Sequence, residues 1–585
     1  MNTKKIICII LVAAVMMSLL SACGSIPSRA SSTVPAVLSV TPISTAVSSS
    51  DAALTGGEIA VTLSDSGSSC EDPSVQISGS TITITAAGDY VLTGPLSDGQ
   101  ILINAPEDAK VKLILNGVSI IKNGHAAIYA VSADKLVLSS AEGSENLLQS
   151  TGEYVQTDIN NVDAAVFAKC DLTLSGVGIL NISSLTGHAV VSKDDLKLKS
   201  GTVNLEAANK GLCGKDSVLI EGGVLNADVG TDGIYSANEE DSSKGSITIE
   251  GGTLSLLCQK DGLDASGDIV LSGGVAVINA GSGQEGKGIK SDANIRISGG
   301  SLTVTSVDDA IHASGSVDLS GGTLLLSTGD DGIHADAALT VCGGDLTVSQ
   351  SYEGLEAQVI TVSGGMMRVN ARDDGFNAAG GNDSSNSGGF FGADPFTTDS
   401  EANLTVSGGT VYINTEGDGL DSNGQLSMSG GSVFISGPTN SGNGALDYGI
   451  DGVISGGTII AVSAAGMAEN FGQNSSQGSI LVNLSSSQAA DSIVSLLDSA
   501  GNVLASFQPE KSYSSVVVST PDLSVGETYT VVAGNETQSV TLASLIYGSG
   551  GMRGGMGHGG FGGMQSPEMG NFGPSAGFGG PGRRG

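Results

Sequence analysis

A pair of glycines recurs along the middle of this chain at a nearly constant interval. The first glycines of these pairs are Gly222, Gly251, Gly273, Gly299, Gly321, Gly343, Gly364, Gly408, Gly430 and Gly456. The commonest interval is 22 residues, and most of the others are lengthened by insertions or by one doubled step. A fixed period of this length is typical of a repeat architecture, in which many units stack into one body.

Within each unit apolar residues alternate with polar ones. Leu346 and Val348 follow one glycine pair, and Leu355 and Ala357 follow the next acidic turn. A period of two predicts strands with one buried face, and three such strands leave no room for a helix. The signatures of leucine-rich repeats and of the nine-residue calcium β-roll do not fit this spacing. The fold predicted is an all-β, right-handed parallel β-helix of about 22 residues per coil, whose stacked strands lie about 4.8 Å apart.

The N-terminus has the pattern of an export signal. Lys4 and Lys5 precede a short apolar run, and Leu20-Ser21-Ala22-Cys23 resembles a bacterial lipobox. This predicts a lipoprotein signal peptide over 1–22 and a lipid on the Cys23 thiol. The protein is then exported and anchored at the extracellular face of the cell membrane; an ordinary signal peptide or an uncleaved anchor is the alternative.

Composition predicts the remaining boundaries. Residues 23–57 are rich in Ser and Thr and read as a tether, and 58–470 carry the repeats of the β-helix. Alternating runs over 478–547 predict a small β module, and the Gly/Met-rich tail 548–585 is expected to be disordered. The loop 379–402 interrupts the array, and its aromatic residues are expected to pack onto the coils: Phe390, Phe391 and Phe396.

Charge limits the partners. The net charge of −36 and the pI near 4.2 argue against nucleic acid, whose phosphates would be repelled. Cations, or anions bridged by cations, fit better, and we expect a monomer. The absence of Trp disfavours aromatic strips for crystalline polysaccharide.

Five cysteines lack zinc-ligand spacing and are expected to be small buried residues: Cys70, Cys170, Cys213, Cys258 and Cys342.

An acidic turn lies at a fixed place in most units, usually twelve residues before the first glycine, and Lys210 and Lys287 replace the acid in two of them. Stacking of coils would therefore place acid above acid, and a second polar column would lie three residues further on. Asp-Gly turns are ordinary turn chemistry, but this does not explain the additional carboxylates of Asp308, Asp330 and Asp373. Neighbouring carboxylates at this spacing repel by about 3 kcal/mol at an effective dielectric constant near 20.

Protonation, the nearby lysines or a hard divalent cation would each offset this repulsion. Calcium binds six to eight oxygens in flexible geometry, which a column of turns can offer. The predicted calcium ligands are Asp261, Asp264, Asp308, Asp309, Asp330, Asp331, Glu353, Glu356, Asp373, Asp374, Asp418 and Asp421. Solvated turn acids are the alternative. His312 and His334 should lie one above the other, and we interpret them as stacked structural rings rather than a zinc site.

Most of the mature chain resembles a known family. The residues that carry the resemblance are the segments 88–120 and 126–148, the units of the form SGGTLxxxxxDDGIHA, and the module over 509–534. They are similar to bacterial surface β-helix proteins that bind carbohydrate and are related in fold to pectate lyases. The resemblance implies a right-handed parallel β-helix that holds Ca²⁺ and binds plant-type polysaccharide, particularly acidic sugars, without established catalysis.

Three functions follow from these features. The first is a non-catalytic polysaccharide-binding lipoprotein in which calcium bridges the acidic column to uronates such as polygalacturonate. The second is a calcium-dependent polysaccharide lyase, which needs a basic side chain beside the sugar. Candidate sugar-contacting residues in both cases are Arg372, Lys287 and Lys290. The third is an adhesin or stalk in which calcium only stiffens the rod.

Overall fold

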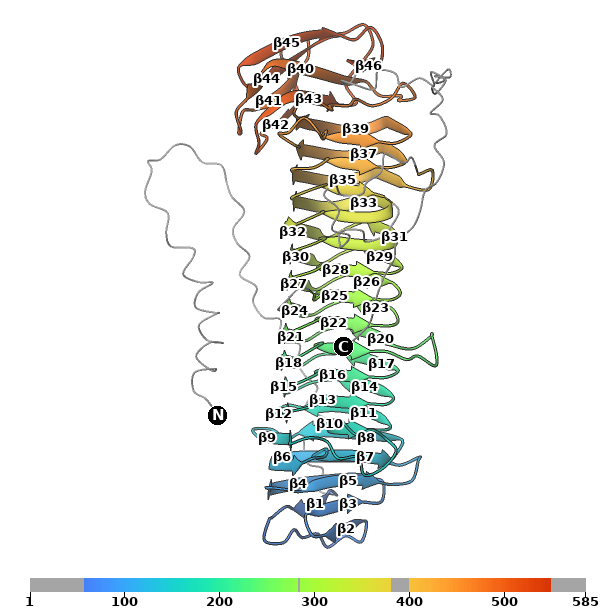
Figure 1. Ribbon diagram of the computed structural model, residues 1–585, viewed down its shortest axis with the longest axis vertical. Coiled ribbons are helices and arrows are strands. Elements are labelled where there is room, and N and C mark those ends of the chain that lie inside the picture. Colours follow the sequence, from blue (N-terminus) through green and yellow to red (C-terminus); the bar gives the residue numbers. More distant parts are fainter. Residues whose placement is uncertain (1–56, 282–284, 380–398, 549–585) are drawn as a thin grey trace, which may run out of the picture. The chain divides into compact units, whose positions relative to one another are not determined.

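A computed structural model describes residues 57–281, 285–379 and 399–548, and these residues form strands and turns but no helix. Within them no helix is therefore present that could cross a membrane. Figure 1 shows the strands stacked coil upon coil, with neighbouring coils paired in parallel. The parallel β-helix predicted from the repeats is confirmed. The predicted signal peptide, Cys23, the Phe-containing part of the 379–402 loop and most of the tail lie outside the described residues.

Three stacks of parallel strands run along the coils. Stack 1 follows the acidic turns and contains β3 (Thr81–Ile84), β5 (Gln100–Asn104), β7 (Ile128–Ser132), β10 (Ala164–Ala168), β13 (His188–Ser192), β16 (Leu212–Gly214), β19 (Ile234–Ser236), β22 (Leu263–Ala265), β25 (Ile289–Ser291), β28 (Ile311–Ala313), the beginnings of β31 (Ile333–Val341) and β33 (Leu355–Ala371), β34 (Phe376–Ala378), β36 (Leu420–Ser422) and β38 (Leu446–Tyr448).

Stack 2 precedes the glycine pairs. It contains β1 (Ile59–Thr62), β4 (Gly88–Leu96), β6 (Lys110–Asn123), β8 (Lys135–Ser140), β11 (Asp171–Gly176), β14 (Asp195–Leu198), β17 (Ser217–Ile220), β20 (Ser246–Ile249), β23 (Ile269–Leu271), β26 (Ile295–Ile297) and β29 (Ser316–Leu319), and it continues through β31, β33, β35 (Asn403–Thr415), β37 (Gln425–Ser436) and β39 (Asp451–Ser463).

Stack 3 follows the glycine pairs. Its separate strands are β9 (Glu145–Thr151), β12 (Ile179–Ser184), β15 (Thr202–Ala207), β18 (Val224–Val229), β21 (Thr253–Cys258), β24 (Val275–Ala280), β27 (Ser301–Ser306), β30 (Thr323–Ser327) and β32 (Asp345–Ser351). Further on, the second parts of β33, β35, β37 and β39 continue it.

The glycine pairs make the turn between stacks 2 and 3. The second glycine of a pair has positive φ, such as 89° at Gly322, which side chains other than glycine rarely adopt. A Cβ on the first glycine of that pair, Gly321, would lie 2.4 Å from the Ser298 carbonyl oxygen in the preceding coil. The repeat therefore keeps both glycines, one for its backbone conformation and one for the close approach of coils.

The core lies inside the coils, where every second strand residue is buried. Ile289, Ile311 and Ile333 are aligned by strand pairing and are fully buried, which is the ladder that the alternating pattern predicts. One continuous cluster of buried apolar residues extends through the array from Val61 onward. Cys170, Cys213 and Cys258 are buried and unpaired as expected, whereas Cys342 is exposed at the turn before its glycine pair.

The last part of the chain forms antiparallel sheets. β43 (Tyr513–Ser519) pairs with β39 and with β40 (Ser479–Gln488), and β40 also pairs with β46 (Ile546–Tyr547). A second sheet contains β41 (Val494–Leu497), β42 (Val503–Phe507), β44 (Thr528–Ala533) and β45 (Glu536–Thr541). These strands share a second apolar cluster, which also includes Ile460 and Val462 of β39.

Candidate functional site

Two polar columns run along the outer side of stack 1. Strand pairing places each outward-facing residue of stack 1 above its counterpart in the preceding coil. The turn residue three positions before it is therefore also placed above its counterpart. The turn column contains Lys210, Asp232, Asp261, Lys287, Asp309, Asp331, Glu353, Asp374 and Asp418. The strand column contains Asp264, Lys290, His312, His334, Glu356, Asn377, Asp421 and Asp447. The structure thus brings the predicted acids into the stacked arrangement expected from their spacing.

The turn carboxylates hold successive coils together. Oδ1 of Asp309 accepts a hydrogen bond from the Asp331 backbone N–H at 3.1 Å, and Oδ1 of Asp331 accepts one from Glu353 at 3.3 Å. Oδ1 of Asp374 accepts the Asp418 backbone N–H at 2.5 Å. These bonds are structural and account for one oxygen of each aspartate. They leave the second oxygen to interact with a neighbouring side chain or a cation.

Lysines balance the charge in the N-terminal half of the columns. Lys287 Nζ lies 3.0 Å from Asp308 Oδ1 and 2.5 Å from Asp309 Oδ2, and its side chain is only 14% exposed. Burial alone would raise the pKa of Asp309, but hydrogen bonds from His312 and the charge of Lys287 outweigh it and lower that pKa to about 2. Asp309 is therefore ionised and paired at neutral pH.

Lys290 and Lys260 have similar roles. Lys290 Nζ lies 3.3 Å from Asp264 Oδ1, and Lys260 Nζ lies 3.0 Å from Asp261 Oδ2. Burial opposes protonation of Lys290, but the charges of Asp264 and Asp292 raise its pKa above the ordinary value. The lysines that we predicted to contact sugar are thus ion-paired within the columns.

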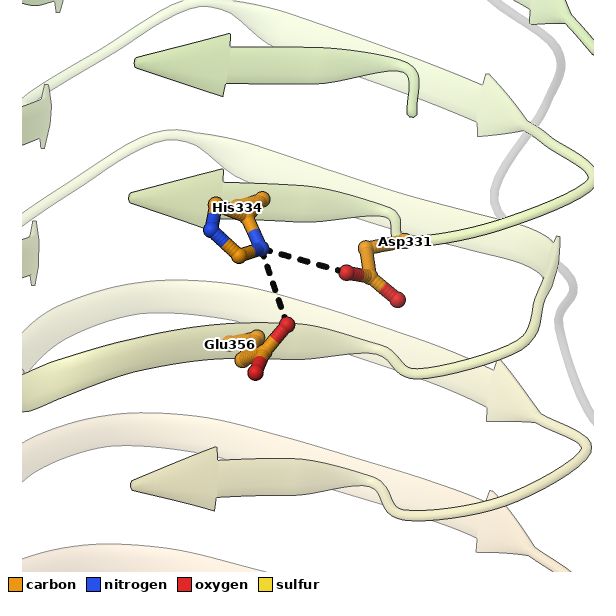
Figure 2. Close-up of side chains that lie close together, drawn as sticks. All are labelled: Asp331, His334 and Glu356. Atoms are coloured by element: carbon orange, nitrogen blue, oxygen red, sulfur yellow. Dashed lines mark hydrogen bonds and ion pairs between the residues drawn. The ribbon is translucent and has the colours of Figure 1, made fainter. Parts of the chain in front are cut away.

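A histidine occupies the middle of the strand column (Figure 2). His334 Nδ1 lies 2.8 Å from Glu356 Oε2 and 3.3 Å from Asp331 Oδ2. Burial lowers the pKa of His334, but hydrogen bonds with Asp331 and Glu356 outweigh this effect and raise it to about 11. The imidazolium therefore supplies a positive charge to two carboxylates. It stacks on His312 with ring centroids 4.8 Å apart, which confirms the predicted stacking of the two rings.

Glu353 and Asp374, in the C-terminal half of the turn column, lack such balance. Burial raises the pKa of Glu353 well above its ordinary value, and the charges of Glu356 and Asp331 raise it further. Burial also raises the pKa of Asp374, with added repulsion from Asp418 and Asp421. In the described ranges no lysine or arginine lies within ion-pair distance of Glu353 or Asp374. A proton or a cation would therefore stabilise these half-buried carboxyl groups.

The donors at this end suit a hard cation. Asp374, Asp418 and Asp421 each offer one oxygen, and these oxygens lie within 4.8 Å of one another. Oδ1 of Asn377, the residue between Glu356 and Asp421 in the strand column, is buried without a hydrogen-bond partner, while Nδ2 donates to Glu353 Oε2 at 2.9 Å. Oxygen-only donors are those that Ca²⁺ prefers. The residues present therefore fit a calcium ion.

Several other predicted site residues already have protein partners. Asp308, Asp309 and Asp330 also form a group whose oxygens converge, but Lys287 already contacts two of them. Arg372 donates from Nη2 to the Gly329 carbonyl oxygen at 2.6 Å and lies over the Tyr352 ring. Asp373 hydrogen-bonds Tyr352, and that bond raises the pKa of the tyrosine.

Two acidic clusters contain residues that were missing from the predicted ligand set, namely Asp232, Asp171, Asp194 and Asp195. Asp232 joins Asp261 and Asp264 in a buried cluster. Lys210 Nζ lies 2.7 Å from Asp232 Oδ2. Asp171, Asp194 and Asp195 form another cluster, and burial together with Asp216 raises the pKa of Asp194 to about 6. The adjacent aspartates at 194–195 were the available signal, but they lie before the regular glycine pairs begin.

The sequence matches known proteins in part. Residues 78–332 match the sequence model of a family described as "Carbohydrate-binding domain-containing protein". A protein of that description from Acetivibrio thermocellus is 30% identical over 128 residues, which are 22% of this chain and 45% of that protein. The chain therefore aligns with less than half of this curated relative.

A solved structure is also similar. It is described as the polysaccharide lyase-like protein from C. thermocellum in a gadolinium derivative, with 25% sequence identity and a TM-score of 0.36. The match covers 48% of this chain and 96% of that one. Over residues 78–332 the chain carries the sequence pattern of the carbohydrate-binding family, and the resemblance expected from its sequence is confirmed.

Proposed function

We infer that this protein is a non-catalytic, lipid-anchored surface protein that binds acidic polysaccharide through calcium held on its polar columns. The match to the carbohydrate-binding family supports a polysaccharide partner. The observation that carries the calcium assignment is the C-terminal half of the turn column, where Glu353 and Asp374 are half-buried with raised pKa values and without a basic partner among the described residues. A bound cation would remove the need to protonate them.

Calcium would also explain how an acidic protein holds an acidic polymer. With a net charge of −36, the protein would repel uronate chains by itself. Asp374, Asp418 and Asp421 would hold the ion from the protein side, and Asn377 Oδ1 is a further neutral donor nearby. When bound, the ion supplies positive charge and open coordination positions that sugar carboxylates can occupy.

The pairing and protonation of the basic residues favour non-catalytic binding over lyase activity. A lyase needs a neutral amine or another base within reach of the sugar C5 proton. Lys287 and Lys290 are ion-paired, and neighbouring aspartates raise the pKa of each above the ordinary lysine value. Both lysines therefore stay protonated at neutral pH. Arg372 is held by a backbone carbonyl and by Tyr352.

Paired variants test this proposal. The double variant Asp374→Asn/Asp418→Asn removes two of the proposed ligands while keeping side-chain shape, and Asp318→Asn changes an exposed carboxylate outside the columns as the matched control. Calcium titration followed by polygalacturonate titration should show loss of both binding steps in the double variant only. Retention of calcium-dependent polygalacturonate binding in the double variant would exclude this cluster as the bridge.

A further inference from the structure

A cavity lies away from the acidic columns, near the N-terminal end of stack 1. It has a volume of about 460 Å³, within the range typical of small-molecule sites. Leu102 of β5 and Tyr129 of β7 are aligned neighbours in its floor, and the loop 152–163 between β9 and β10 forms a wall. The cavity thus lies on the same outer face of the coils as the strand column, several coils earlier.

The wall is fixed in place by hydrogen bonds. Val155 N–H donates to the Gly124 carbonyl oxygen at 2.8 Å, which ties the loop to the turn before β7. The Gln156 side chain closes the loop on itself, because Nε2 donates to the Val162 carbonyl at 3.0 Å and Oε1 accepts the Val162 N–H at 2.9 Å. A preformed cavity of this kind loses little conformational entropy when a ligand binds.

The polar groups of the cavity are oriented by their neighbours. Gln100 Nε2 donates to His125 Nδ1 at 2.8 Å and to the Ala126 carbonyl at 2.7 Å, so its two amide hydrogens are used and Oε1 remains as an acceptor. Asp158 Oδ2 accepts the Tyr129 hydroxyl at 2.5 Å, and its Oδ1 accepts the Asn160 N–H at 2.8 Å. Each of these carboxylate oxygens can accept a further hydrogen bond.

The charges of the lining disfavour an anionic ligand here. The hydrogen bond from Tyr129 lowers the pKa of Asp158, so this carboxylate is ionised, and Glu153 adds a second negative charge to the lining. Burial lowers the pKa of His125, which leaves the ring neutral near pH 7. Lys122 is paired with Asp98 at 2.9 Å. Hydroxyl donors of a neutral sugar can satisfy these acceptors, whereas a uronate carboxylate would be repelled.

The apolar part of the lining completes a sugar-binding surface. Leu102, Val131 and Val155 line the cavity, and Val155 is 63% exposed at its mouth. Apolar side chains beside oriented acceptors match the two faces of a pyranose ring, whose C–H and O–H groups point in different directions. We propose that this cavity is a calcium-independent subsite for a neutral saccharide, distinct from the calcium-bridged binding of acidic polymer.

Saturation-transfer NMR and calorimetry in excess chelator test this proposal with three neutral disaccharides: cellobiose, maltose and α-1,4-galactobiose. At least one should bind the wild-type protein, and binding should be lost in Val155→Trp, whose indole would fill the mouth. Val503→Trp, at a similarly exposed valine of β42, is the matched control and should bind normally. Circular dichroism and the thermal midpoint of each variant establish that it is folded.

Asp158→Asn gives an independent readout, because asparagine still accepts the Tyr129 hydrogen bond but carries no charge. Neutral-sugar binding should weaken about tenfold, since a hydrogen bond to a charged acceptor is lost. Absence of binding by all three disaccharides, or full binding by Val155→Trp, would overturn the proposal. Preference for digalacturonate that strengthens in Asp158→Asn would also overturn it. Asp374→Asn/Asp418→Asn should leave neutral-sugar binding unchanged, so failure of either site is distinguishable from failure of the other.

Discussion

The substitution Asp374→Asn should have opposite effects in the absence and presence of calcium. Oxygens of Asp374, Asp418 and Asp421 lie within 4.8 Å of one another, and two full charges at that distance repel by about 3 kcal/mol at an effective dielectric constant near 20. Asparagine keeps the acceptor for the Asp418 N–H and removes the charge. Because part of the repulsion is already relieved by proton uptake, we expect the calcium-free variant to be about 1–3 kcal/mol more stable than wild type at pH 7.

Calcium should reverse this order. Calcium at about one hundred times its Kd would stabilise the folded wild-type protein by about 2.7 kcal/mol. The variant lacks one of the carboxylates that would hold the ion, so calcium should stabilise it less. Thermal unfolding in chelator and in excess calcium measures both effects.

The pH dependence provides a second check: a buried acid with a raised pKa contributes stability that is present at low pH and lost as pH rises through its folded-state pKa. Calcium-free wild type should therefore lose stability as pH rises above the ordinary carboxylate range, and the variant should lose less.

Asp309→Asn is the matched control for this prediction. Asp309 pairs with Lys287, which also contacts Asp308, so Asp309→Asn removes one of the two carboxylates beside this ammonium. It should cost about 1.5–3 kcal/mol with or without calcium. The reasoning would be refuted if Asp374→Asn were less stable than wild type in chelator, or if calcium stabilised wild type and Asp374→Asn equally.

Three further predictions concern the columns and the coil turns. The folded-state pKa of Asp309 is about 2, so its contribution to stability is present above the ordinary aspartate pKa and should be lost as pH falls from about 4 to about 2. Acid unfolding of wild type and of Asp309→Asn measures this loss, and equal acid sensitivity of the two proteins would contradict it. The pKa of His334 is about 11, so its contribution to stability is fully present below the ordinary histidine pKa and is lost progressively as pH rises from about 6.5 to about 11. Ring resonances in NMR should show an imidazolium from pH 6 to pH 9, and titration near pH 6.5 would show that the carboxylates do not hold the proton. Gly322→Ala should destabilise by about 1–2 kcal/mol because its φ is +89°, and an unchanged thermal midpoint would show that the turn can relax.

The spacing of the sequence was sufficient to predict the coil and both columns. Every pair of glycines has the same backbone requirement, and the alternation of Leu302 and Val304 with polar residues assigns one strand face to the core. Once coils stack in register, residues one period apart must lie above one another. The stacking of His312 on His334 follows from this argument alone.

The charge balance within the columns could not be predicted in the same way. It depends on the direction of long side chains between coils, such as Lys287 reaching Asp308 and Asp309 in the next coil. Spacing also gave no indication that His334 contacts Glu356 of the next coil as well as Asp331 of its own. The period therefore located the acids but did not separate those that are paired from those that need a cation.

The cavity beside Tyr129 was likewise beyond prediction from the repeat. Its wall is the insertion 152–163, and an insertion has no counterpart in neighbouring coils from which its path could be inferred. The hydrogen bonds of Gln156 with Val162 and of Asp158 with Tyr129 fix that path. These contacts join residues far from any recognisable motif.

Calorimetric titration of polygalacturonate into the wild-type protein, first with calcium and then with excess chelator, tests the central claim most directly. We expect binding with calcium and its loss in chelator, because the bridging charge is removed while the β-helix remains folded. Binding of equal strength in chelator would contradict the claim, since the acidic columns would then play no part in holding the polymer.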